Sequence, residues 1–291
     1  MHRTPCQLII LLLLCGVGSS CNRDRVINPF EDNIGTYSAY GALDLGKSTN
    51  AIRIRNVSTP FLIDSTIGYE DVNLFFIDPS TDTELQLPDT IINFNGNYTY
   101  NYLLKQNLQP SSTYGVKLVF DGGQESSTTI TTPAVTIADT TPDKASNCRQ
   151  NLRISFKNVK RPEFINAEVG VLYQGSMHWA PIQTIQTPEF IDGLDEMELQ
   201  LTVTNLLVDI FPPPPEATIN IPPRFWLPTV SCNELDEPTM YIRYIHFGPE
   251  WEQFRGTEFL SDMFVDSETI DNGIGFIGAI RRDSFSFTFE L

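Results

Sequence analysis

The side chains that most often perform acid–base or nucleophilic chemistry are sparse in this chain. Beyond the first twenty residues its histidines are His178 and His246, so a Ser-His-Asp triad would have to use one of them. The sequence contains neither the Gly-x-Ser-x-Gly elbow of serine hydrolases nor the His-Glu-x-x-His spacing of a zinc helix. We therefore expect no catalytic residue, no metal site and no cofactor.

A glycine motif near the C-terminus suggests nucleotide chemistry by its spacing alone. Gly273, Gly275 and Gly278 match Gly-x-Gly-x-x-Gly, which binds pyrophosphate where a strand turns into a helix. The residues that follow, 284–289, alternate as a strand would, so the required helix is missing. We expect these glycines to allow close backbone approach in a terminal hairpin.

The charge balance excludes one class of partner and leaves one class of enzyme open. The 291 residues include 36 Asp and Glu against 19 Lys and Arg, a net charge of -17, which repels nucleic acid phosphates. With acids this abundant, two carboxylates in the second half could lie at glycosidase separation, and an envelope glycan hydrolase is the alternative function. Examples are Glu250, Glu252, Glu258, Asp262 and Asp266.

Aromatic residues favour binding over chemistry. Trp226, Tyr244 and Trp251 lie in an aromatic-rich region beside acids, where exposed rings could stack on a sugar or contact a partner protein. These three residues are the candidate partner surface. Packing in a core is the alternative fate for most of the aromatics in this region.

The N-terminus predicts export. Arg3 is followed by an apolar run over residues 7–17 and by small residues before Cys21, which is the pattern of a secretory signal. This ending resembles the lipobox of bacterial lipoproteins, although Gly18 stands where Leu or Val is usual. The resemblance implies that Cys21 is acylated and anchors the chain to a membrane. The alternative is ordinary signal cleavage, which would leave Cys21 as a free thiol.

The rest of the chain predicts two β-rich domains. We assign residues 1–20 to the signal peptide, 21–34 to a tether, 35–134 to a β-sandwich, 135–145 to a linker and 146–291 to a second β-rich domain. Short alternating segments dominate both domains, as Ile52 and Ile54 do between Arg53 and Arg55. A short helix is expected from Trp251 to Phe264.

One segment specifies the kind of sandwich. Leu108, Pro110 and Tyr114 resemble the Leu-x-Pro-x-x-x-Tyr segment of fibronectin type III domains. The resemblance implies an immunoglobulin-like or fibronectin-like sandwich, in which the tyrosine hydroxyl bonds back to the preceding turn as a tyrosine corner. Tyr114 is then structural.

The cysteines predict one disulfide. If Cys6 and Cys15 leave with the signal and Cys21 takes lipid, only Cys148 and Cys232 remain in the folded region. They can pair only with each other, and an oxidising compartment favours that bond. The alternative is a pair of buried thiols too far apart to bridge.

A second resemblance concerns most of the expected mature chain. Residues 271–278, the Ser231-Cys232 pair and the N-terminal sandwich resemble uncharacterised outer-membrane lipoproteins of Bacteroidota-like bacteria. The resemblance implies a location in the cell envelope, at the outer membrane, and no assigned activity. Because some of these lipoproteins are encoded near TonB-dependent transporters, an outer-membrane transporter is one candidate partner. The function we expect is therefore non-enzymatic binding or presentation to a protein or glycan.

Overall fold

The structure is a computed structural model. It describes part of the chain. The expected signal peptide, the tether and Cys21 lie outside the described residues. The described residues are 37–56, 72–94, 97–120, 123–182, 189–191, 193–218, 221–222, 226–254 and 270–290.

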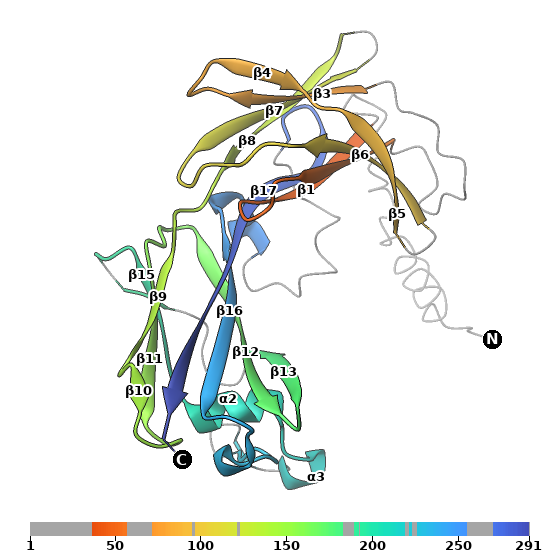
Figure 1. The fold of residues 1–291 in the computed structure, drawn as a ribbon. Coiled ribbons are helices and arrows are strands. Elements are labelled where there is room, and N and C mark those ends of the chain that lie inside the picture. The colour runs from red at the N-terminus through yellow and green to blue at the C-terminus, as the bar shows by residue number, and fades with distance from the viewer. Residues whose placement is uncertain are drawn as a thin grey trace, which may run out of the picture.

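The chain is mostly β-structure arranged in two sandwich lobes (Figure 1). In the first lobe, part of a nine-stranded sheet packs on a four-stranded sheet of order β4-β3-β7-β8. The predicted immunoglobulin-like or fibronectin-like, mostly β fold class is confirmed. The strands of this lobe are β1 (Tyr37–Asp44), β2 (Asn50–Asn56), β3 (Val72–Asp78), β4 (Thr83–Gln86), β5 (Asp89–Phe94), β6 (Asn97–Leu104), β7 (Thr113–Phe120) and β8 (Glu125–Thr131).

The second lobe packs the other end of the nine-stranded sheet on a second four-stranded sheet, β14-β15-β11-β9. Its core lies between these sheets and includes the fully buried Ile154, Phe156 and Ile242. The elements are β9 (Ile137–Thr141), β10 (Lys144–Ala145), β11 (Asn151–Lys157), β12 (Phe164–Tyr173), β13 (Ser176–Pro181), β14 (Glu189–Phe190), β15 (Glu196–Thr202), α2 (Val203–Ile210), α3 (Pro215–Thr218), η2 (Cys232–Glu234), β16 (Thr239–Phe247), η3 (Pro249–Phe254) and β17 (Ile274–Phe289).

The last strand, β17, belongs to both lobes. Its first half pairs in parallel with β1, from Ile274 opposite Ser38 to Ile280 opposite Asp44, and its second half pairs with β16. Figure 1 shows β17 running from one lobe into the other. Among the described residues, the glycine segment therefore pairs in parallel with β1 instead of forming the expected terminal hairpin, and part of the segment 146–291 completes the first sandwich.

The glycines of the C-terminal motif allow the close approach that was expected of them. Gly275 has φ +121°, and a Cβ there would lie 2.0 Å from the Ala39 carbonyl oxygen of β1. A Cβ at Gly278 would lie 2.5 Å from Trp251 Nε1. The parallel pairing of β17 with β1 therefore requires glycine at position 275.

The segment expected as a linker, 135–145, forms two strands. β9 pairs with β11, and β10 pairs with the end of β17. β9 is an edge strand that stops before Pro142, and edge strands tolerate a neighbouring proline. The proline of this segment, Pro142, therefore marks a sheet edge.

Two local expectations about the second lobe have different outcomes. The predicted disulfide is confirmed: Cys148 and Cys232 are bonded, with Cα atoms 6.5 Å apart. The helix expected from Trp251 is a 3-10 turn, η3, as far as residue 254, and 255–264 lie outside the described residues. The eight-residue helix α2 instead follows β15, where Thr202 accepts a hydrogen bond from the Asn205 N–H as an N-cap.

Tyr114 forms the hydrogen bond of a tyrosine corner. Its ring is buried in the first core, and its hydroxyl accepts from the Gln109 N–H at 2.9 Å. Leu108 is buried beside it in the same core. The motif thus fastens the turn before β7 to the sandwich.

Replacing Tyr114 with phenylalanine is expected to lower the free energy of unfolding by about 1 kcal/mol. The ring still packs on Phe76, at 5.0 Å between centroids, but the Gln109 N–H loses its acceptor. Urea unfolding of both proteins measures the difference. Unchanged stability would show that water replaces the hydroxyl at no cost.

Candidate functional site

The outward face of β12, β16 and β17 carries an ion pair. Register places Glu168 opposite Arg243 and Arg243 opposite Ser284. Cross-strand partners project from the same face of a sheet, so these three side chains share one surface. Arg243 Nε binds Glu168 Oε2, and 48% and 41% of the two side chains remain exposed. A ligand can therefore reach the pair from solvent.

Trp179 of β13 holds Arg243 in place. The indole lies over Gly170 of β12, where a Cβ would be 2.6, 2.7 and 2.8 Å from three ring atoms. The Arg243 Cζ lies 4.2 Å from the indole centroid, a cation–π contact. Because the indole and Glu168 both orient the guanidinium, its terminal N–H groups are preorganised as donors.

Glu168 and Arg243 also line a cavity of about 640 Å³. Small-molecule sites commonly measure roughly 300–1,000 Å³, so the volume suits a small ligand or the end of a larger one. The lining contains both apolar and polar side chains. The remaining lining residues are Ile165, Asn166, Ala167, Pro181, Ile182, Leu199, Tyr244, Ile245, Arg282 and Asp283.

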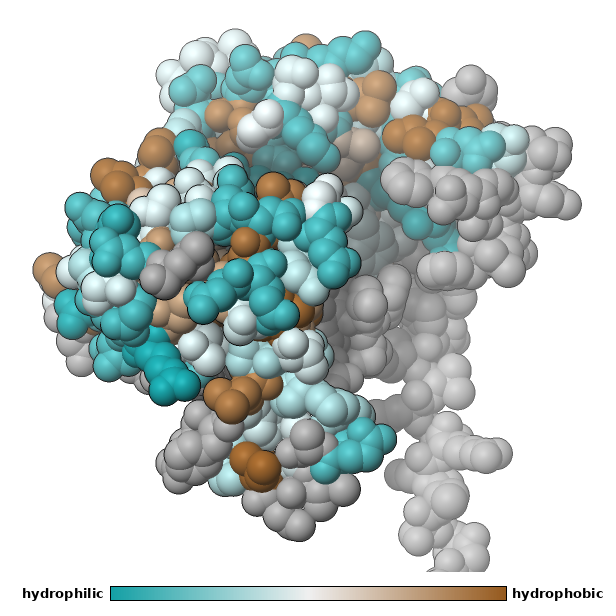
Figure 2. Space-filling view, turned by 60° about the horizontal axis from the view of Figure 1, so that its bottom comes forward, coloured by the Kyte–Doolittle hydropathy of each residue, from teal (hydrophilic) through white to brown (hydrophobic). Residues whose placement is uncertain are grey.

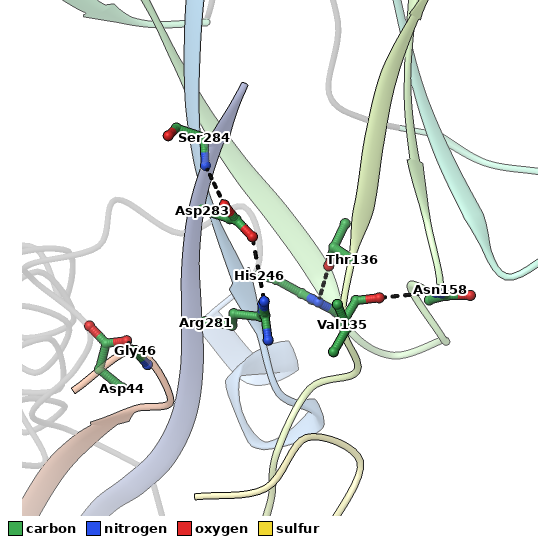
Figure 3. A network of polar contacts seen from close by, with 9 residues as sticks. All are labelled: Asp44, Gly46, Val135, Thr136, Asn158, His246, Arg281, Asp283 and Ser284. Atoms are coloured by element: carbon green, nitrogen blue, oxygen red, sulfur yellow. Dashed lines mark hydrogen bonds and ion pairs between the residues drawn. The ribbon is translucent and has the colours of Figure 1, made fainter. Parts of the chain in front are cut away.

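The charges of this lining are balanced. Arg243 and Arg282 face two carboxylates, those of Glu168 and Asp283. Arg282 Nη1 also lies 3.2 Å from the buried Asp44 Oδ2 of the first lobe. Asp283 Oδ2 lies 3.5 Å from Arg281 Nη2, a contact drawn in Figure 3. The cavity therefore offers donors and acceptors with little net charge.

Two of the three aromatics expected at a partner surface are buried, which corrects that expectation. Tyr244 and Trp251 are each 4% exposed. Tyr244 belongs to the inward-facing set of β16 and packs on Phe156, and Trp251 packs on Phe276 at 4.6 Å. Desolvation by burial raises the pKa of Tyr244 to about 12; Asp283 adds to the shift and Arg281 opposes it.

Trp226 keeps partial exposure but lies apart from the cavity lining. Its indole Nε1 donates to the Ile221 carbonyl oxygen at 2.8 Å, which holds the ring against its own loop.

The sequence interpretation missed Trp179, Arg243 and Glu168. Gly170 and the alternation within β12 and β16 are signals for them, but their joint significance depends on the pairing register.

His246 joins a hydroxyl and a carboxylate, as a catalytic histidine would. Its Nδ1 lies 2.6 Å from Thr136 Oγ1, a contact drawn in Figure 3, and its Nε2 lies 2.8 Å from Glu163 Oε2. The three residues are 0%, 5% and 7% exposed. Since a substrate has no access to the hydroxyl, we assign this network a structural role between the lobes. His178 instead contacts Tyr173 and Phe211 through its ring.

Only some of the carboxylates expected for a hydrolase belong to the described residues. Glu258, Asp262 and Asp266 lie outside the described residues. In the cavity, Glu168 and Asp283 each bind an arginine. Within the described ranges, no three His, Cys, Asp or Glu side chains group as metal ligands.

Comparisons with known proteins give no family. No family model matches the chain, and neither does any curated protein. Among solved structures, the chicken CNTN1 FN1–FN3 domains are 11% identical with a TM-score of 0.21, covering 73% of this chain and 59% of that chain.

Two further solved structures show the same level of likeness. A tetra-tandem repeat from the extending region of a large adhesion protein is 11% identical with a TM-score of 0.21. The match covers 87% of this chain and 50% of that chain. A pullulanase of Anoxybacillus sp. LM18-11, complexed with maltotriose, is 8% identical with a TM-score of 0.20. That match covers 72% of this chain, which spans about a quarter of the pullulanase. At these scores the likeness carries no argument about function.

Proposed function

We propose that this chain is a non-enzymatic, lipid-anchored protein of the cell envelope that binds a glycan through its second lobe. The observation that carries the binding proposal is the pair of Arg243 and Glu168 in the lining of a cavity of about 640 Å³, with Trp179 packed on the Arg243 guanidinium. Carboxylates accept hydrogen bonds from sugar hydroxyls, and an oriented guanidinium donates to them. Since the lining is balanced in charge, a neutral saccharide is the ligand class we favour.

Other features support a polar ligand rather than a large apolar partner surface. On the face drawn in Figure 2, hydrophobic residues are scattered among hydrophilic ones. The net charge of -17 disfavours nucleic acid as a partner. No described helix has the length and apolar character needed to cross a bilayer. A protein partner, with an outer-membrane transporter as one candidate, stays compatible with this role.

Replacing Arg243 with methionine tests the site. Methionine can still cover the Trp179 ring but has no N–H donors, so we expect the Kd for a saccharide to rise at least about tenfold, or 1.4 kcal/mol. The measurement is titration of the full-length protein in detergent with saccharides selected on an array of envelope glycans. The matched control is Arg149→Met, at an exposed position outside the cavity. Binding by Arg243→Met equal to that of the unaltered chain would refute the site.

The anchor needs its own experiment. Cells fed a palmitate analogue should label the unaltered protein, whereas Cys21→Ala should stay unlabelled and leave the membrane fraction. An unlabelled wild-type chain would exclude lipidation. The glycan proposal does not depend on this result, because the Arg243→Met titration tests it.

A glycan hydrolase is the second candidate, because Glu168 and Asp283 both line the cavity. Their arginine contacts argue for binding. Release of reducing ends from a bound saccharide, lost in both Glu168→Gln and Asp283→Asn, would favour the hydrolase. Stable binding without such release would favour the non-enzymatic role.

A further inference from the structure

Glu250 connects the two lobes through its side chain. It lies in η3, directly after β16 of the second lobe, and its Oε1 accepts a hydrogen bond from the Thr131 N–H at the end of β8. Gly248, which precedes η3, donates its N–H to the Ala279 carbonyl oxygen of β17 at 2.9 Å. Three segments that pass between the lobes therefore meet at this point.

The second oxygen of the Glu250 carboxyl group lies among acceptors. Oε2 is buried and has no hydrogen-bond partner among the described residues. A Cβ built on Gly248 would lie 2.5 Å from the Thr131 carbonyl oxygen, 2.9 Å from Glu250 Oε2 and 3.3 Å from the Ala279 carbonyl oxygen. Three oxygens thus lie within 3.3 Å of one point, and none of them can donate a proton if the carboxyl group is ionised.

The surroundings of Glu250 disfavour the ionised form. Desolvation by burial raises the pKa of Glu250 above its usual range. Hydrogen bonds from the Thr131 main chain, from the main chain of Glu250 itself and from the Thr131 side chain oppose this shift, and the Glu163 carboxylate adds to it. Glu163 precedes β12 and binds His246 of β16. β8 presents Thr131, and β17 places Arg281 opposite His246 in the ladder.

We propose that Glu250 is a proton-dependent latch between the lobes: its protonated carboxyl group donates to a main-chain carbonyl oxygen of the junction while still accepting from the Thr131 N–H. One side chain then connects η3 to the junction both as a hydrogen-bond acceptor and as a hydrogen-bond donor. The latch is closed when both hydrogen bonds are present, which requires acid. Ionisation removes the bond that Oε2 donates, because a carboxylate has no proton to give, whereas Oε1 still accepts from the Thr131 N–H. This inference goes beyond the binding function and does not depend on it.

The sign of the pH dependence follows from the direction of the shift. A group whose pKa is raised in the folded state contributes stability that is fully present below its unfolded pKa. That stability is lost as the pH rises through the folded pKa. The latch is therefore expected to be closed near pH 4.5 and open at pH 8.

Glu250→Gln makes a permanent latch, since the glutamine amide accepts through its oxygen and donates through its nitrogen. In the full-length protein, we expect the variant to melt about 3 °C above wild type at pH 8, and the gap to close as the pH falls to about 4.5. Glu216→Gln, on the exposed α3, controls for the loss of one negative charge. Parallel melting curves for wild type and Glu250→Gln, or a variant less stable at every pH, would overturn the proposal.

A site-specific measurement on the unaltered chain keeps the test independent of any variant. With threonine labelled with ¹⁵N, the Thr131 amide resonance should titrate with a midpoint above about 4.3, the usual glutamate value. A resonance that stays fixed between pH 4 and pH 8, or that titrates below that value, would overturn the latch.

Discussion

Gly275→Ala is expected to lower the free energy of unfolding by about 4 kcal/mol, combining backbone strain with a steric clash. The residue has φ +121°, and the new methyl group would lie 2.0 Å from the Ala39 carbonyl oxygen and 2.9 Å from the Ala39 nitrogen. These contacts are main-chain atoms, so no side-chain rotation relieves them. The parallel ladder between β1 and β17 would have to separate.

The effect should reach both lobes. β17 carries Ile277 and Ala279 into the first core and Phe287 and Phe289 into the second. We therefore expect wild type to unfold in one transition under guanidinium. Gly275→Ala should either move this transition to lower denaturant or split off the first lobe.

Gly175→Ala is the matched control for backbone strain. Gly175 has φ +72° in a turn, and a Cβ there would meet nothing within 4 Å. Only the left-handed backbone is penalised, by about 1–2 kcal/mol. If both variants lose the same stability, the close contact with Ala39 is not what requires glycine at position 275.

His246→Leu is expected to cost about 3–5 kcal/mol, because it removes one partner of a buried polar pair. Among the described residues, the Glu163 carboxylate would keep the Lys160 N–H, at 3.3 Å, as its hydrogen-bond donor, in a residue that is 7% exposed. The Thr136 hydroxyl would lose its partner as well. Denaturant unfolding at pH 7 measures the loss.

The double variant Glu163→Leu with His246→Leu separates the two contributions. Removing both polar partners also removes the uncompensated carboxylate, so the double variant should be more stable than His246→Leu alone. If the two losses simply add, the contact between Glu163 and His246 does not couple the residues. In that case the junction would be held by its backbone hydrogen bonds and apolar packing.

The junction has consequences for the proposed binding site. Arg282 lines the cavity and also binds Asp44 of β1, so one wall of the cavity is fixed to the first lobe. The Leu45 N–H donates to the Ile280 carbonyl oxygen at 3.0 Å beside it. The first sandwich therefore also supports a residue of the candidate site.

Some properties of this chain follow from its sequence because they depend on short-range patterns. The alternation of Ile52 and Ile54 with two arginines predicts a strand with one buried face, and both isoleucines are buried in β2. The segment from Leu108 to Tyr114 fixes its own turn through one local hydrogen bond. The pairing of Cys148 with Cys232 follows by elimination among the cysteines once an export signal is assumed.

The tertiary structure alone decided which strands become neighbours. A period of two shows that Tyr244 and Ile242 share a face, but not whether that face meets a core, and both proved to be buried. Trp179, Gly170 and Arg243 come from three strands, so their contact depends on register between segments that the sequence does not connect. The same applies to β17: its alternation predicts a strand, and only non-local pairing with β1 and β16 makes it the element that joins the two sandwiches.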